Sequence, residues 1–276
     1  MVNYLKELTQ TLRLKISNIL LPVGERKVLQ TQVNGYALLV IANEDVGRLI
    51  HFLGCYEPGE TALIRQITRA DSICVDVGAN VGYFTILMAS VANEGTVHAF
   101  EPIPLNAALL RASAELNGLR NVRVNECAVA DHHGVVSFSQ STDSAYSSIR
   151  DTGRKPSERT FSTSVIALDE YLDRERVRRV DILKVDAEGA EALIVAGASR
   201  LLGDDRRKPR LVILELYDQN LQAFGSSVET VIERMGGYGY KPFVVSPQGE
   251  LLPYVDQFKA RYYNVVFTVP EPNAGR

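Results

Sequence analysis

The sequence predicts an α/β protein built on a doubly wound, mostly parallel sheet of seven strands, with an N-terminal extension of helix and hairpin. From residue 71 onward, short apolar runs that suit strands alternate with runs of helical periodicity. This alternation is typical of a parallel sheet covered by helices on both faces. The last two strand-like runs follow each other without a helix between them, so we expect an antiparallel pair at one edge. The 276 residues suffice for one large domain of this class with decorations.

Residues 1–70 lack this alternation, and we interpret them as a helix, hairpin and cap segment that precedes the main domain, residues 71–276. Apolar residues recur at steps of three and four over residues 3–20, which predicts a helix with one apolar face. They are Leu5, Leu8, Leu12, Ile16 and Ile19. We expect this face to dock on the main domain or on a second copy of the chain. Its basic face is too thin to favour a membrane-surface helix.

A hairpin should follow this helix. Two strand-like runs, 27–33 and 36–41, flank Asn34 and Gly35, and both residues tolerate the positive φ angles of a type I′ turn. Two more helices are then expected, over residues 44–53 and 57–69.

The main domain should contain seven strands, over residues 72–77, 96–100, 122–124, 180–185, 210–216, 241–245 and 262–269. Helices are expected over residues 82–91, 105–116, 190–201 and 228–235. Residues 137–164 are polar and rich in Ser and Thr. We expect a long loop there, and long loops in compact domains are often functional or mobile.

Composition and charge argue against several classes of protein. The net charge of −3 and the pI near 5.9 give no basic footprint for a nucleic acid. No signal peptide pattern is present, and no run approaches the roughly 18 apolar residues of a membrane-spanning helix. Cys55, Cys74 and Cys127 are far apart and odd in number, which suits reduced thiols. We therefore expect a soluble, cytoplasmic protein that binds neither nucleic acid nor membrane.

The turn after the first main-domain strand carries the strongest chemical signal. The strand ends at Asp76, the turn contains Gly78, Asn80 and Gly82, and a helix begins near Gly82. Glycines let the backbone bend and approach a ligand at the carboxyl edge of the sheet, where open α/β sheets bind ligands. A dinucleotide site would have a glycine in place of Asn80, and Asp76 would repel its diphosphate. The pattern favours a zwitterionic ligand with an ammonium group.

Two further strand ends add to this site. Glu101 ends the second strand directly before Pro102, and an acid at this place can accept the hydroxyl groups of a ribose. After the third strand, Cys127 and Ala128 can offer a backbone N–H and a small apolar contact to an adenine ring. An acid at a strand end can also merely cap a helix. Three such turns in order nevertheless predict a site for an adenosine-containing cofactor.

The end of the fourth strand supplies the remaining candidates. Asp186 ends the strand, Glu188 lies in the following turn, and Gly189 begins the next helix. Both carboxylates should project into the same crevice, close to the reacting group. Glu191 suits the first turn of that helix, where the helix dipole favours an acid.

Together, residues 76–82, 100–102 and 184–191 resemble the FkbM family of S-adenosylmethionine-dependent methyltransferases, and the resemblance covers roughly residues 56–217. It implies a class I, Rossmann-like methyltransferase fold and S-adenosyl-L-methionine as the cofactor. It also implies methyl transfer to a hydroxyl oxygen of a small molecule such as a sugar, a polyketide or another natural product. Residues 1–55 and the C-terminal part match no motif, so the acceptor pocket is not assigned.

Methylation of an alcohol needs alignment of the oxygen with the methyl group and a base that takes the proton. Glu188 and Asp186 are the candidate catalytic residues, and Asp186 can instead hold the methionine end of the cofactor. His98 lies inside a strand and is expected to be a core histidine.

A metal-dependent mechanism and two other functions compete with this hypothesis. Catechol-type methyltransferases hold magnesium through acids after the fourth and fifth strands, which Asp186 and Glu215 could mimic. Gly189 stands where their lysine base would fall and Leu216 where an amide ligand would fall, so we expect no essential metal. A nicotinamide-dependent oxidoreductase and a non-catalytic adenosine-binding partner stay open as alternatives.

Overall fold

The computed structural model describes residues 26–255 and 263–269. Its central sheet consists of β3 (Ile73–Val77), β4 (Thr96–Phe100), β5 (Val122–Asn125), β9 (Ile182–Val185), β10 (Leu211–Leu216), β11 (Lys241–Val245), β12 (Leu251–Pro253) and β13 (Tyr263–Thr268). The spatial order is β12-β11-β13-β10-β9-β3-β4-β5. The five strands from β10 to β5 are parallel, and β13, β11 and β12 add antiparallel pairs. The chain order reverses between β3 and β9, and ligands bind at such switch points.

The seven predicted strands are all present in this sheet, and β12 extends it as an eighth strand next to β11. The sequence did not reveal β12, because three residues that end in Pro253 carry no strand periodicity. The closing pair, β11 and β13, is antiparallel as expected. Its predicted place at the edge was wrong for β13, which lies between β10 and β11.

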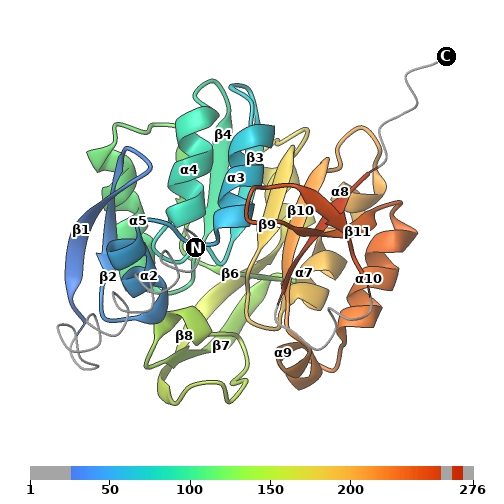
Figure 1. The fold of residues 1–276 in the computed structure, drawn as a ribbon. Coiled ribbons are helices and arrows are strands. Elements are labelled where there is room, and N and C mark those ends of the chain that lie inside the picture. Colours follow the sequence, from blue (N-terminus) through green and yellow to red (C-terminus); the bar gives the residue numbers. More distant parts are fainter. Residues whose placement is uncertain (1–25, 256–262, 270–276) are drawn as a thin grey trace, which may run out of the picture.

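Helices cover both faces of the sheet (Figure 1). They are α4 (Tyr83–Val91), α5 (Pro104–Leu116), α6 (Leu168–Arg174), α7 (Glu191–Gly197), α8 (Ser199–Gly203), α9 (Asp218–Ala223) and α10 (Val228–Gly237). Neighbouring strand residues point to opposite faces, so Cys74 joins the core under α4 and α5, while Val75 joins the core under α6, α7 and α10. The two buried cores thus hold the strands in place. The carboxyl ends of the strands are therefore held in fixed positions relative to one another.

The extension packs on the first of these cores. It contains β1 (Val28–Val33), β2 (Tyr36–Ile41), α2 (Asp45–Leu53) and α3 (Pro58–Ile67). The φ angles of 55° at Asn34 and 89° at Gly35 are those of the predicted tight turn. The backbone N–H of Ala37 donates to the Asn117 side chain at 2.9 Å, which ties β2 to the end of α5. The helix predicted over residues 3–20, with its suggested role in self-association, lies outside the described residues.

The Ser-rich stretch is not the predicted long loop. It forms β7 (Gly134–Ser141) and β8 (Ser157–Ala167), which pair with each other. β8 also pairs with β6 (Ala128–Ala130), so the three strands form a separate sheet of order β6-β8-β7. Along β7 and β8, Ser or Thr recurs between other residues, and threonine suits a strand that is exposed on one face. This sheet lies below the main sheet in Figure 1. Across the described residues, no helix has the length and apolar character needed to cross a bilayer.

Candidate functional site

A cavity of about 900 Å³ opens where the parallel strands end. Its wall is formed by the ends of β3, β4, β9 and β10, by residues just before α3, and by a short 3-10 helix, η1 (Ser144–Tyr146). This volume is within the range of pockets that bind cofactors and small molecules. Nine predicted site residues line it: Asp76, Gly78, Asn80, Glu101, Pro102, Cys127, Ala128, Asp186 and Glu188.

The glycine turn brings two strand ends into contact. Gly78 has a φ of +75°, and a Cβ atom added there would lie 1.7 Å from the backbone oxygen of Asp186. Only a residue without a side chain allows the turn after β3 to pack this closely on the turn after β9. Gly82 does not line the cavity as the sequence suggested. An added Cβ there would meet Leu110 of α5 at 2.1 Å, so Gly82 serves the packing of α4 on α5.

Asp76 is held at the end of β3 by a hydroxyl group. The Thr85 hydroxyl donates to Asp76 Oδ2 at 2.5 Å, and the Asp76 side chain is almost fully buried. Burial raises the pKa of Asp76, and the charge of Lys184 acts in the opposite direction. The Asp76 carboxylate is therefore a fixed acceptor under the glycine turn.

Glu101 accepts hydrogen bonds from the turn after β3 and from the turn after β4. Its Oε2 accepts the backbone N–H of Asn80 and its Oε1 accepts that of Ile103, each at 2.8 Å. Burial raises the pKa of Glu101 to about 7, although these two bonds favour the ionised form. Each carboxylate oxygen has a second lone pair, so Glu101 can also accept ribose hydroxyl groups from the cavity side.

A buried lysine faces the acids at the end of β9. Lys184 Nζ lies 3.1 Å from Asp186 Oδ2 and 4.7 Å from the centre of the Phe84 ring. Burial alone would lower the pKa of Lys184, but Asp186, Glu57 and Asp76 raise it above its usual range. The surrounding acids thus favour the charged form of Lys184, which serves as their counter-charge. The Asp186 side chain keeps 19% exposure, which leaves it accessible from the cavity.

Glu188 is fixed by two donors on the same oxygen. Arg154 Nη1 lies 2.6 Å from Glu188 Oε2, and Asn220 Nδ2 donates to Oε2 at 2.5 Å. Arg154 itself stacks between the rings of Tyr146 and Tyr217, at 4.5 and 5.0 Å from their centres. Burial raises the pKa of Glu188 to about 7. Because both bonds fall on Oε2, Oε1 is the oxygen that can act on a ligand.

The structure adds residues that the sequence did not single out. Arg154 comes from the stretch predicted to be a loop, and Glu57 precedes α3 with a φ of 42°. Burial raises the pKa of Glu57 to about 7, and Glu57 Oε2 is buried without a hydrogen-bond partner. A further cavity residue is Asn264 on β13. No local motif could have indicated these three residues, because each lies far in sequence from the strand ends that it faces.

Two other predicted positions have structural roles. Glu191 is in the first turn of α7, as predicted, and its carboxylate accepts the backbone N–H groups of Ala187 and Gly189 at 2.9 and 3.0 Å. It thereby shapes the turn that carries Glu188. His98 is buried and lies 2.8 Å from the Tyr171 hydroxyl, so the prediction of a core histidine is confirmed.

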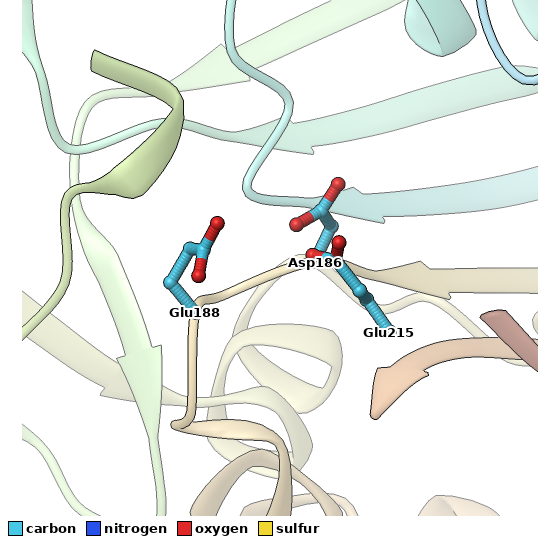
Figure 2. A group of neighbouring side chains, drawn as sticks. All are labelled: Asp186, Glu188 and Glu215. Carbon is cyan, nitrogen blue, oxygen red and sulfur yellow. The ribbon is translucent and has the colours of Figure 1, made fainter. Parts of the chain in front are cut away.

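Three carboxyl groups converge at the end of β9 and β10. One oxygen from each of Asp186, Glu188 and Glu215 lies within 4.8 Å of the others, and Figure 2 shows the three side chains directed toward one another. Burial and the nearby Asp186 raise the pKa of Glu215 well above its usual range. The arrangement can bind a cation or share protons, and it can take a proton from a bound hydroxyl group.

Comparison with known proteins identifies the family of this chain. Residues 76–242 match the family model described as methyltransferase FkbM domain. The chain is 28% identical to 31-O-demethyl-FK506 methyltransferase FkbM of Streptomyces tacrolimicus, over 66% of this chain and 77% of the relative. It is 24% identical to 2-O-methyltransferase NoeI of Sinorhizobium fredii, over 58% and 69%. It is 25% identical to hexuronic acid methyltransferase AglP of Haloferax volcanii, over 70% and 75%. The chain belongs to the FkbM family and is a methyltransferase of the class I fold.

Proposed function

We propose that this methyltransferase transfers a methyl group from S-adenosylmethionine to a hydroxyl oxygen of a small molecule. One observation carries the proposal: a single cavity is lined by acids from β3 and β4 on one side and from β9 and β10 on the other. The first pair suits an adenosine cofactor with an ammonium group, and the second suits proton removal from an acceptor. The cavity is large enough for ligands on both sides.

The residues at the cofactor side fit S-adenosylmethionine. Bound S-adenosylmethionine supplies an electrophilic methyl group on a positively charged sulfur. Glu101 is placed for the ribose hydroxyl groups, and Cys127 and Ala128 line the wall where an adenine ring would lie. Asp76 and Asp186 offer negative charge for the methionine ammonium group.

The acceptor is proposed to be a hydroxyl group because the nearby base is a buried carboxylate, that of Glu188. Glu188 Oε1 would receive the hydroxyl proton while the acceptor oxygen attacks the methyl carbon. Arg154 and Asn220 hold Glu188 Oε2, so the carboxylate keeps its orientation. The names of two relatives, a 31-O-demethyl-FK506 methyltransferase and a 2-O-methyltransferase, support an oxygen acceptor.

The two alternatives make different demands on the same cavity. A nicotinamide-dependent oxidoreductase would place a diphosphate on the turn from Gly78 to Gly82, directly after the buried carboxylate of Asp76, which would repel it. A non-catalytic binding protein would bind the cofactor but would not need Glu188 to be fixed beside the acceptor space.

Calorimetric titration tests the cofactor first, with S-adenosylmethionine, S-adenosylhomocysteine and NAD as ligands. We expect binding of the first two and none of NAD, and tight NAD binding without S-adenosylmethionine binding would refute the proposal. A panel of sugars, hexuronic acids and polyketide alcohols is then incubated with isotopically labelled methyl donor and analysed by mass spectrometry. Label found only on nitrogen, carbon or carboxylate acceptors would refute the hydroxyl assignment.

A further inference from the structure

We propose that Asp186 and Glu215 bind a divalent cation such as Mg²⁺ on the acceptor side of the cavity, next to Glu188. The proposal reverses the expectation from the sequence that no metal is needed. That expectation relied on Gly189, which stands where a lysine base would fall, and on Leu216, which stands where an amide ligand would follow the acid of the fifth strand. The amide comes instead from another strand, and only the fold reveals it.

The first step of the argument is the convergence of acids. Asp186, Glu188 and Glu215 each offer an oxygen within 4.8 Å of the other two (Figure 2). They come from the ends of β9 and β10, which are neighbouring parallel strands held in register by Leu214 and Val185. Carboxylate oxygens are the ligands that Mg²⁺ prefers. Asp186 and Glu215 are the direct ligands in our proposal, because Glu188 already binds Arg154 and Asn220.

The second observation is independent of the acids: the side-chain oxygen of Asn264 has no hydrogen-bond partner. Asn264 lies opposite Glu215 in the antiparallel pairing of β10 with β13. Directly opposed residues have their side chains on the same face of a sheet, with Cβ atoms about 5 Å apart. Asn264 is 8% exposed, its Nδ2 donates to Glu60, and its Oδ1 is buried without a hydrogen-bond partner. An amide oxygen of this kind is a third hard ligand beside the two carboxylates.

Glu215 also has a buried oxygen without a hydrogen-bond partner. Its side chain is 4% exposed, and Oε1 is buried without a hydrogen-bond partner. Buried polar atoms in native proteins nearly always have a partner, and an unpaired one needs an explanation. Two unpartnered oxygens, from Glu215 and Asn264, thus line the same cavity. A bound cation accounts for both.

The third step is the balance of charge. The described lining of the cavity contains eight carboxyl groups, those of Asp45, Glu57, Glu60, Asp76, Glu101, Asp186, Glu188 and Glu215. It contains two cationic side chains, Lys184 and Arg154, and these pair with Asp186 and Glu188. Within the described residues, Glu215 has no ion pair. Lys184 Nζ contacts Asp186 at Oδ2. When Glu215 is ionised, its buried charge needs a further counter-charge, which a cation between Asp186 and Glu215 would supply.

The consequence for catalysis rests on the proposed function. A hydroxyl group bound to the cation would be more acidic than in water. Its proton would pass to Glu188 Oε1, the O–H bond would break as the oxygen–methyl bond forms, and the sulfur would keep the electron pair of its broken bond. Glu188 is close enough to serve an acceptor on the cation, since its oxygen is within 4.8 Å of those of Asp186 and Glu215.

The test measures metal binding alone, without cofactor or acceptor. The full chain is treated with a chelator and dialysed, and Mn²⁺ is titrated while the electron paramagnetic resonance signal of free Mn²⁺ is recorded. Calorimetry with Mg²⁺ gives a second reading. We expect one ion per chain, and an affinity at least tenfold weaker in Glu215→Gln. Glu94→Gln is the control, because Glu94 is exposed and does not line the cavity.

Asp186→Asn provides a second variant, and circular dichroism shows whether each variant is folded. Absence of Mn²⁺ binding by the wild-type chain would overturn the proposal. Equal affinity of the wild type and of a folded Glu215→Gln or Asp186→Asn variant would overturn it as well. Metal binding that persists in a chain unable to bind S-adenosylmethionine would refute the proposed function and leave the cation site standing.

Discussion

The two sides of the cavity are built in different ways. The glycine-turn side consists of Asp76, the turn from Gly78 to Gly82, and Glu101. Its carboxylates accept bonds from Thr85 and from the backbone N–H groups of Asn80 and Ile103. All these residues lie within one stretch of chain, so the geometry of this side is local.

The carboxylate side consists of Asp186, Glu188 and Glu215 with their partners Arg154, Asn220 and Asn264. These residues come from β9, β10, β13, α9 and the segment before β8, and long-range side-chain contacts hold them. Backbone hydrogen bonds thus fix the geometry of the glycine-turn side, whereas interactions between charged side chains fix that of the carboxylate side. This difference predicts that substitutions on the first side damage binding and folding, while substitutions on the second damage turnover.

The largest effect is expected for Gly78→Ala, because Gly78 joins the two sides. An added Cβ would overlap the Asp186 backbone oxygen, and we expect the free energy of unfolding to fall by about 3 kcal/mol. Gly118→Ala is the matched control. Gly118 has a similar φ of +66° but no atom within 4 Å of an added Cβ, so it should lose only about 1 kcal/mol. Chemical denaturation measures both, and equal losses would show that the contact with Asp186 does not matter.

Glu188→Gln should separate turnover from binding. The substitution keeps the shape of the side chain but removes the base, so we expect turnover to fall about a hundredfold. Affinity for S-adenosylmethionine should stay nearly unchanged, because Glu188 faces the acceptor and not the cofactor in the proposed function. Single-turnover kinetics and calorimetry give the two values. Full activity in a folded Glu188→Gln variant would remove Glu188 from the reaction.

Glu101→Ala should show the opposite behaviour. Losing a charge-assisted hydrogen bond to a buried ligand costs about 1.5–3 kcal/mol, so affinity for S-adenosylmethionine should fall about tenfold or more. The melting temperature should also drop, since Glu101 braces Asn80 and Ile103. Turnover at saturating cofactor should recover. An unchanged dissociation constant in the folded variant would place the ribose elsewhere.

The smallest effect is expected for the pH dependence of stability, and it arises from His98 in the core beneath the glycine-turn side. Burial lowers the pKa of His98 to about 4, from an ordinary value near 6.5. The unfolded chain therefore binds a proton between these values while the folded chain does not, so stability is lost as the pH falls from 6.5 toward 4. We expect a loss of about 1 kcal/mol at one pH unit below 6.5.

His98→Gln should remove this part of the pH dependence, as followed by denaturation at several pH values. His132→Gln is the control, because His132 is 55% exposed. An identical loss of stability with acid in wild type and His98→Gln would show that another group is responsible.

The sequence by itself determined the glycine-turn side. Asp76, Gly78 and Glu101 follow apolar strand patterns at fixed short distances, and parallel strands end at one edge of a sheet. The alternation of strands and helices and the Asn34-Gly35 hairpin were predictable for the same reason, because short-range backbone preferences decide them.

On the carboxylate side, the sequence indicated the acids Asp186, Glu188 and Glu215, but only the tertiary structure decided which residues contact them. The register of β10 against β13 puts Asn264 opposite Glu215, and the placement of β13 inside the sheet depends on packing far from residue 264. Arg154 reaches Glu188 because the Ser-rich stretch folds as β7 and β8. The polar residues of these strands resemble a loop sequence when no partner strand is known. Pairing between distant segments is set by burial of shared surfaces and not by local periodicity. The partners of these carboxylates can therefore be identified only in the folded chain.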